Sequence, residues 1–150
     1  MKKLLLLITS VSVLAAIGSF AVAGASTGRT HRFTGSFTVT REITSLTWQH
    51  ANPGTTSVGD RFEFTSNLLK DGDVIGHQGA ACTVLRVKGD SDTFVCDGTY
   101  LLPAGTITAQ AYRAGNQSTN NVAITGGTGI YRDARGEIVS DGDTFTFEVS

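Results

Sequence analysis

Turn-forming clusters of Gly, Asn, Asp and Pro recur about every ten residues along most of this chain, and they limit the fold more than any other feature. Short antiparallel strands have this spacing, whereas helices need longer uninterrupted segments. After the first 25 residues, no segment shows a sustained apolar period of about 3.6 residues. The spacing therefore predicts an all-β chain, with strands at 32–41, 44–50, 60–69, 74–88, 93–102, 106–112, 121–125, 131–140 and 144–149.

Apolar and polar side chains alternate within several of these segments. Phe62 and Phe64 alternate with Arg61 and Glu63, so one face of that strand is expected to be buried and the other to face water. About eight such strands must protect their edges, and closure into a small antiparallel barrel removes the edges altogether. A two-sheet sandwich is the main alternative, which composition alone does not separate from a barrel.

The N-terminal segment has the three-part composition of a secretory signal peptide. Two lysines precede a predominantly apolar run over residues 4–16, and mostly small residues follow as far as Ala25. The apolar run is shorter than the roughly 20 residues that a membrane-spanning helix needs. We therefore predict a signal peptide at residues 1–25, cleaved after Ala23 or Ala25, and a secreted protein that is extracellular or associated with the cell envelope.

Residues 26–150 have the usual size of one domain, and we expect a single barrel there. Once the two lysines of the signal peptide are removed, 10 basic residues remain against 13 acidic ones, a net charge of −3. Neither sign forms a long block. Nucleic acids, and membranes after signal cleavage, are therefore not expected partners.

The two cysteines, Cys82 and Cys96, are predicted to form a disulfide. A turn-rich cluster at residues 88–92 lies midway between them, so a hairpin there would place them opposite each other on adjacent strands. Export would bring them into an environment where disulfides persist. A reactive thiol pair is the alternative, but no basic residue stands beside either cysteine to lower its pKa.

The segment at residues 122–138, VAITGGTGIYRDARGEI, contains an aliphatic strand, a TGGTG turn, an aromatic residue and an A-x-G motif that opens the next strand. This order resembles the segment shared by plant dirigent proteins and allene oxide cyclases. Upstream, a Gly-Asp pair at residues 59–60, a Phe-Thr pair at 64–65 and a glycine-led segment at 79–85 are similar to the order in allene oxide cyclases. The resemblance extends over residues 58–138.

The resemblance implies an eight-stranded antiparallel barrel that receives a small, largely apolar ligand and needs no cofactor. Allene oxide cyclases steer an unstable epoxide into one ring-closed stereoisomer, and dirigent proteins orient phenoxy radicals made by a separate oxidase, so both act mainly by positioning. Both plant families form trimers, which implies a homotrimer here. The implied function is a secreted, cofactor-free barrel that directs the cyclisation or stereoselective coupling of a small hydrophobic or aromatic molecule. A non-catalytic ligand-binding or structural barrel is the alternative.

The same resemblance suggests candidate site residues. In the cyclases an Asn on this strand orders a catalytic water, and that position is Ser66 when counted from Phe64 or Asn67 when counted back from Gly72. An acidic residue is expected on the first strand, and Glu42 is the nearest one. Tyrosine hydroxyls could bond a ligand oxygen, or belong to core and rim residues. Candidate catalytic residues are Glu42, Asn67 and Tyr112, and candidate ligand-binding residues are Phe62, Phe64, Ser66 and Tyr100.

Two further patterns have functional interpretations that the spacing disfavours. The glycines of the TGGTG turn introduce no helix and precede no Lys-Ser or Lys-Thr pair, so a phosphate-binding loop is not expected. Gly136 instead suits a bulge or a tight corner of a barrel. The three histidines lack zinc-ligand spacing, and the Asp pairs in turns lack the rest of a calcium loop, so we expect no metal.

Overall fold

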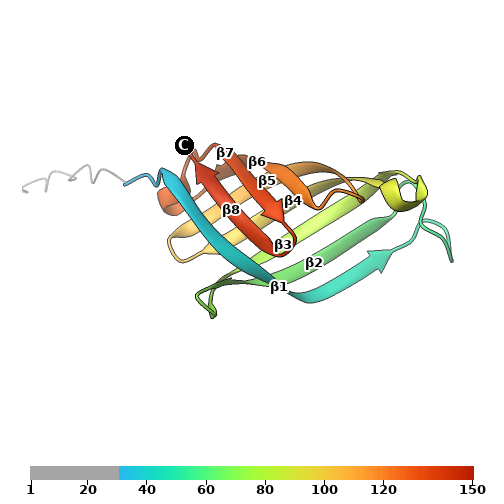
Figure 1. Ribbon diagram of the computed structural model, residues 1–150, viewed down its shortest axis with the longest axis horizontal. Helices are drawn as coiled ribbons and strands as arrows, with labels where there is room; N and C mark the ends of the chain where they lie inside the picture. The colour runs from blue at the N-terminus through green and yellow to red at the C-terminus, as the bar shows by residue number, and fades with distance from the viewer. Residues whose placement is uncertain (1–30) are drawn as a thin grey trace, which may run out of the picture.

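A computed structural model describes residues 31–150, apart from the side chain of Asp90 (Figure 1). The predicted signal peptide at residues 1–25 lies outside the described residues. Within the described part, no helix has the length and apolar character needed to cross a membrane.

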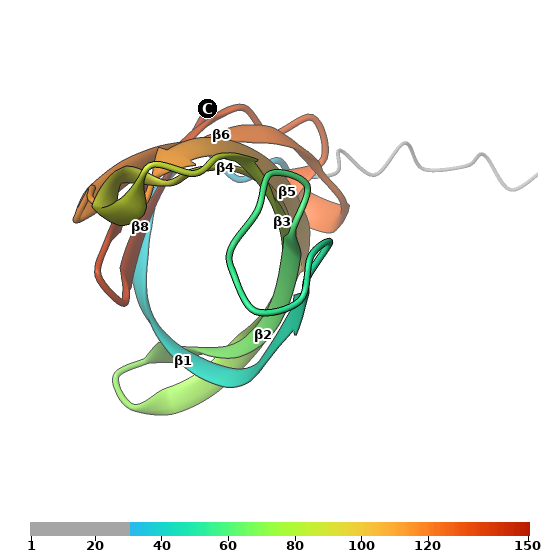
Figure 2. The same cartoon turned by 90° about the vertical axis from the view of Figure 1, so that its right-hand side faces the viewer.

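The described chain is a closed barrel of eight antiparallel strands in sequence order (Figure 2). The barrel closes where the first six residues of the first strand pair with the last strand, from Gly35 opposite Val149 to Thr40 opposite Thr144. The predicted barrel is therefore confirmed, and the two-sheet alternative is wrong. The strands are β1 (Gly35–Gln49), β2 (Arg61–Lys70), β3 (Asp73–Arg86), β4 (Thr93–Leu102), β5 (Gly105–Ala114), β6 (Thr119–Gly127), β7 (Gly136–Asp141) and β8 (Thr144–Val149).

The break that we expected between residues 41 and 44 does not occur, because β1 continues through a β-bulge. The register with β2 shifts between Ile43 and Ser45. The extra residue lets Thr44 and Ser45 both lie on the outer side, while Ile43 and Leu46 face the barrel interior. In a regular strand, residues three positions apart lie on opposite faces. The bulge explains why Ile43 and Leu46 lie on the same face.

The strand expected at residues 131–140 begins later than predicted. Tyr131 ends a short 3-10 turn, η2 (Gly129–Tyr131), and packs into the core. β7 then starts at Gly136, whose φ of 120° favours glycine. A Cβ at this position would collide with the backbone oxygen of Glu148 on β8, so the close approach of the two strands requires glycine.

One end of the barrel is filled by aromatic side chains. Phe37 stacks on Phe147 with ring centroids 4.6 Å apart, and Tyr100 meets Phe147 edge-on at 5.1 Å. Phe33 and Tyr131 pack edge to face beside them. This core closes the end of the barrel at which β1 begins and β8 ends (Figure 1).

The opposite end is open on one side because the strands differ in length. β7 and β8 have six residues each, whereas β1 has fifteen. Pairing with β8 stops at Thr40, so among the described residues the remainder of β1 pairs only with β2. Ile43, Leu46 and Trp48 on the inner face of this segment are therefore 48%, 53% and 40% exposed. Figure 2 looks into this open end, where the loop between β1 and β2 crosses one side of the opening.

Candidate functional site

The open half of the barrel encloses a cavity of about 420 Å³ that receives side chains from all eight strands. A larger hollow of about 620 Å³ lies on the outer face, where it is lined by outward-facing residues such as Glu63, Thr65 and Thr99. The inner cavity is the better candidate site, because small-molecule sites are concave, apolar and enclosed, with volumes of roughly 300–1,000 Å³. The size and lining of this cavity are those of a barrel that binds small molecules.

Aromatic side chains form the wall of the cavity nearest its mouth. Trp48 packs on Phe62 with ring centroids 4.6 Å apart, and Phe94 meets Phe62 edge-on at 5.4 Å. Phe64 continues this row one step deeper. Phe62 and Phe64, two of the predicted ligand-binding residues, therefore line the cavity, and a role in ligand binding stays a prediction. Trp48 and Phe94 were not predicted, although the alternation of Leu46 with Trp48 was a signal that could have indicated the first.

A row of polar side chains crosses three strands deeper in the barrel. Ser66 on β2 lies opposite Gln78 on β3, which lies opposite Tyr100 on β4. All three side chains face inward and are nine-tenths or more buried. Gln78 and Tyr100 line the cavity directly, and Ser66 is the next member of the row.

Two atoms of this polar row are buried without a hydrogen bond. Among the described residues, Ser66 Oγ and Gln78 Oε1 have no hydrogen-bond partner. Such atoms cost about 1–3 kcal/mol each and are rare in native proteins. Gln78 lines the cavity, so a ligand or a water molecule there is in a position to complete its hydrogen bonds.

Tyr100 remains a neutral hydrogen-bonding group at this position. Burial raises the pKa of Tyr100 to about 12, against smaller opposing effects from the Arg41 charge and the Gln78 side-chain amide. The phenol is therefore protonated throughout the physiological range, and its O–H is available as a donor.

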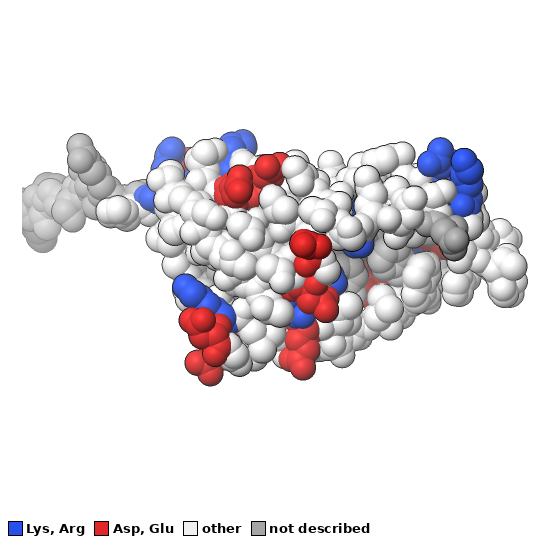
Figure 3. Space-filling view, in the orientation of Figure 1, with Lys and Arg blue, Asp and Glu red and all other residues white. Residues whose placement is uncertain are grey.

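Arg41 lines the cavity, and its charge acts on Tyr100 of the polar row. Its guanidinium carbon lies 5.2 Å from the ring centroid of Phe145 and 5.8 Å from that of Phe64, which is within cation–π range. One of its terminal nitrogens lies 2.8 Å from Asp143 Oδ1, in the turn between β7 and β8. The carboxylate partly neutralises the positive charge in the cavity wall. Figure 3 shows only scattered charged side chains on the face that it displays.

The predicted disulfide between Cys82 and Cys96 is confirmed. The two residues lie opposite each other on β3 and β4, with Cα atoms 4.1 Å apart. The bridge faces inward and lines the cavity, beside the aromatic row. It therefore fixes two neighbouring strands of the cavity wall, a location that the sequence did not indicate.

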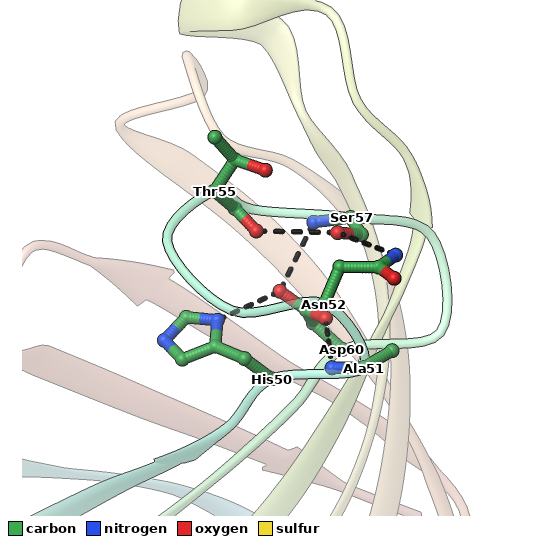
Figure 4. A network of polar contacts seen from close by, with 6 residues as sticks. All are labelled: His50, Ala51, Asn52, Thr55, Ser57 and Asp60. Atoms are coloured by element: carbon green, nitrogen blue, oxygen red, sulfur yellow. Dashed lines mark hydrogen bonds and ion pairs between the residues drawn. The ribbon is translucent and has the colours of Figure 1, made fainter.

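A hydrogen-bonded loop stands at the mouth of the cavity (Figure 4). The side chain of Asp60 is fully buried, and its carboxylate accepts hydrogen bonds from the backbone N–H groups of Ala51 and Ser57, at 2.7 and 3.0 Å. The hydrogen bond from the Ala51 amide has the largest effect on the pKa of Asp60, and the hydrogen bond with the His50 side chain has the second largest. Together they hold this pKa below its usual value, although burial acts to raise it. His50 also stacks in parallel on Trp48, so the loop is connected to the aromatic wall.

The three candidate catalytic residues lie on the outer face of the barrel. Glu42 and Asn67 are paired across β1 and β2, and Asn67 Nδ2 donates to Glu42 Oε2 at 3.3 Å. Tyr112 lies on β5 and is 67% exposed. Their inward neighbours include Arg41 and Ser66, so Ser66 is the residue of the ambiguous pair that faces the interior. A catalytic role for the outward residues stays a prediction, to which this placement adds no support.

The described residues contain no group of three or more His, Cys, Asp and Glu side chains that could hold a metal ion. The hydrogen-bonding side chains that line the cavity are those of Arg41, Gln78, Tyr100, Arg113, Asn120 and Ser140. This set can orient a ligand oxygen beside an aromatic wall.

The family model described as an allene oxide cyclase barrel like domain matches residues 38–141. A solved structure described as pyocyanin demethylase is 28% identical, with a TM-score of 0.72, and the match covers 77% of this chain and 99% of that one. No curated protein matches significantly.

Two further solved structures share the fold at lower identity. One is described as a nonspecific heme-binding cyclase of neoabyssomicin biosynthesis (18% identity, TM-score 0.60), and the match covers 76% of this chain and 62% of that longer chain. The other is described as AbnU, an exo-specific intermolecular Diels-Alderase (14% identity, TM-score 0.58), with 76% and 96% covered. These two likenesses concern the fold alone. With a family match over most of the described strands, the chain belongs to the allene oxide cyclase barrel-like family.

Proposed function

We propose that this protein is an exported barrel that binds a small, flat, hydrophobic or aromatic molecule in its open half and directs the cyclisation or coupling of that molecule. The observation that carries the proposal is the cavity of about 420 Å³, which has an aromatic wall and an incompletely hydrogen-bonded polar row at its base.

The geometry of the cavity supports this type of ligand. The rings of Trp48, Phe62 and Phe94 present a large apolar surface, and contact with such a surface favours a flat apolar molecule. The polar row lies at the base, so a ligand that reaches it is held at one end and along one face. Restricting a flexible reactant in this way lowers the entropic cost of reaching a ring-closing or coupling geometry.

Solved structures with the same barrel fold are described as enzymes, which supports a catalytic function here, but they catalyse different reactions. The solved structures are described as a demethylase, a cyclase and a Diels-Alderase, and all three act on small molecules. One fold can therefore carry different chemistries through changes in the lining residues. We also propose that the protein acts without a cofactor and assembles into a homotrimer. Both proposals rest on the resemblance to allene oxide cyclases and dirigent proteins.

Export is a second part of the proposal. It rests on the signal-peptide pattern of residues 1–25 and on the disulfide, which persists in oxidising compartments. N-terminal sequencing of the exported protein would identify cleavage after Ala23 or Ala25. Retention of the uncleaved chain in the cell would contradict this part of the proposal and leave ligand binding untouched.

A non-catalytic carrier is the alternative function, and one observation favours it. The residues that the cyclase resemblance assigned to catalysis, Glu42, Asn67 and Tyr112, face away from the cavity. A carrier needs the aromatic wall but no reacting groups.

The binding proposal can be tested with the intrinsic fluorescence of Trp48, the single tryptophan of the chain. We expect pyocyanin, phenazine and naphthalene to quench this fluorescence saturably. Phe62→Ala should weaken the affinity about tenfold or more, because an aromatic contact is removed. Leu101→Ala, an exposed residue on β4 outside the cavity, is the control that should change nothing. Absence of saturable binding by every ligand would overturn the proposal.

A reaction separates the catalyst from the carrier. Purified protein would be incubated with an unstable fatty-acid allene oxide, or with phenoxy radicals generated by a one-electron oxidant, and the products resolved by chiral chromatography. A stereochemical excess that disappears in Phe62→Ala supports direction of the reaction. Tight binding with racemic products supports the carrier.

A further inference from the structure

We propose that the ligand carries a hydroxyl group, phenolic or enolic, which donates a hydrogen bond to Gln78 and accepts one from Tyr100 or Arg41 at the base of the cavity. This inference rests on the proposed function, because it names the chemistry of the ligand that the same cavity would bind. It concerns the polar row of Ser66, Gln78 and Tyr100 defined above.

Gln78 provides an unpaired hydrogen-bond acceptor at the base of the cavity. Gln78 lines the cavity, is 5% exposed, and its Oε1 atom has no partner among residues 31–150. Ser66 Oγ, directly across the strand pair, is likewise unpaired within that part of the chain. Buried polar atoms of this kind are normally satisfied in native proteins, by water where no ligand is bound, so a ligand in the cavity is in a position to supply the missing bond to Gln78.

The groups around this acceptor also have a defined hydrogen-bonding character. A glutamine oxygen can only accept, so its partner must bring an O–H or an N–H. Tyr100 is protonated and can donate, and Arg41 uses only part of its five N–H donors on Asp143. The base of the cavity thus offers at least one unpaired acceptor and more than one donor.

These hydrogen-bonding groups select the ligand group. A hydroxyl donates once and accepts at the same oxygen, so it meets Gln78 and a neighbouring donor together. An ether or ketone oxygen only accepts and leaves Gln78 Oε1 unpaired. A carboxylate has the same deficiency, and it would also face Asp143, the acid already bound to Arg41. The apolar body of the ligand would then extend along Phe64 and Phe62 toward Trp48 at the mouth.

The test compares three probes that differ only at this group: 2-naphthol, 2-methoxynaphthalene and naphthalene. At pH 7 the hydroxyl of 2-naphthol is protonated, and the methoxy compound retains the acceptor oxygen but lacks the donor. Affinities would be measured by titration calorimetry or equilibrium dialysis. We expect the protein to bind 2-naphthol about tenfold more tightly than 2-methoxynaphthalene, the effect of one satisfied buried acceptor.

The variant Gln78→Met removes the acceptor at nearly constant volume. It should reduce the preference for 2-naphthol over 2-methoxynaphthalene to less than about threefold and raise the melting temperature, because an unpaired buried group is lost. If Gln78 served only in packing, its replacement would not change the ratio of the affinities for 2-naphthol and 2-methoxynaphthalene. Gln110→Met is the matched control, since Gln110 is exposed and bonded to Asp97 on the outer face. If Gln78→Met does not fold, Gln78→Leu gives a second test of the same ratio, because it also removes the acceptor.

The outcomes separate this inference from the proposed function. Equal affinity of the native protein for 2-naphthol and 2-methoxynaphthalene would overturn the hydroxyl inference while ligand binding stands. A tenfold preference that survives in Gln78→Met would also overturn it. Failure of all three probes, and of the ligands above, to bind would overturn the proposed function and this inference with it.

Discussion

His50 Nδ1 lies 2.9 Å from Asp60 Oδ2, and this contact joins the two ends of the loop between β1 and β2 at the mouth of the cavity (Figure 4). The same imidazole stacks on Trp48, which forms part of the cavity wall. The buried carboxylate therefore stabilises the loop and also supports the aromatic side chain on which ligand contact depends.

The first prediction concerns pH. The pKa of Asp60 lies below its ordinary value of 3.8, so the carboxylate contributes stability that is present above pH 3.8 and is lost as the pH falls through the lower folded-state value. We expect the melting temperature of the native protein to fall in this acidic range. Asp60→Asn should lower the melting temperature at pH 7 and flatten this part of the pH dependence. Asp73→Asn, at an exposed position beside a turn, is the control and should behave as the native protein does. The prediction would be contradicted if the melting temperatures of the native protein and of Asp60→Asn depended on acidic pH in the same way.

The second prediction concerns the disulfide. Cys82 and Cys96 are 14 residues apart, and a bridge that closes a loop of about 15 residues stabilises by about 3 kcal/mol in the chain-entropy model. The double variant Cys82→Ser, Cys96→Ser should therefore lose about 3 kcal/mol of unfolding free energy in urea denaturation. Because the bridge lines the cavity, naphthalene affinity should fall as well. Added reductant should destabilise the native protein and have no effect on the double variant.

The third prediction concerns the charge in the cavity wall. Arg41 is 14% exposed and its partner Asp143 is 65% exposed, so removal of the acid should leave a positive charge beside the polar row. Asp143→Asn should strengthen the binding of 2-naphthoate about two- to fivefold, the range of a partly exposed ion pair. The gain should shrink at high salt. Asp133→Asn, which breaks an exposed pair with Arg32 away from the cavity, should not change this affinity.

The fourth prediction separates the inner face of the barrel from the outer face. Tyr100→Phe should weaken 2-naphthol binding about 2- to 10-fold, because a buried donor is lost. Tyr112→Phe should leave the affinity unchanged, because its side chain is exposed on the outside of β5. The opposite pattern would move the site to the outer surface and support the catalytic role that the sequence suggested for Tyr112.

Local features of the sequence were sufficient to predict much of the fold. Two strand ranges, at residues 93–102 and 144–149, agree with the structure, and the hairpin between the cysteines has the expected pairing. The reason is that turns and period-two alternation involve residues close together in the chain. The break expected before residue 44 and the strand expected at Tyr131 were wrong, because a bulge and a buried turn depend on contacts with distant segments.

The candidate site was predicted less completely than the fold. The sequence suggested Phe62, Phe64 and Tyr100 as ligand-binding residues; all three line the cavity, and their role there stays a prediction. It did not distinguish Ser66 from Asn67, because a shift of one residue reverses the face on which a side chain lies. The structure buries Ser66 at 1% exposure and pairs Asn67 with Glu42 on the outside.

The sequence by itself determined the strand content, the pairing of the two cysteines and the glycine-rich turns, since each of these depends on local conformation or on a unique pairing. Only the tertiary structure decided that the pairing of β1 with β8 stops at Thr40, that the cavity is therefore open on one side, and that Gln78 is buried with an unpaired oxygen. These properties arise from the relative lengths and registers of strands that are far apart in the chain. No local pattern encodes them, because closure of the barrel sets all eight strands at once.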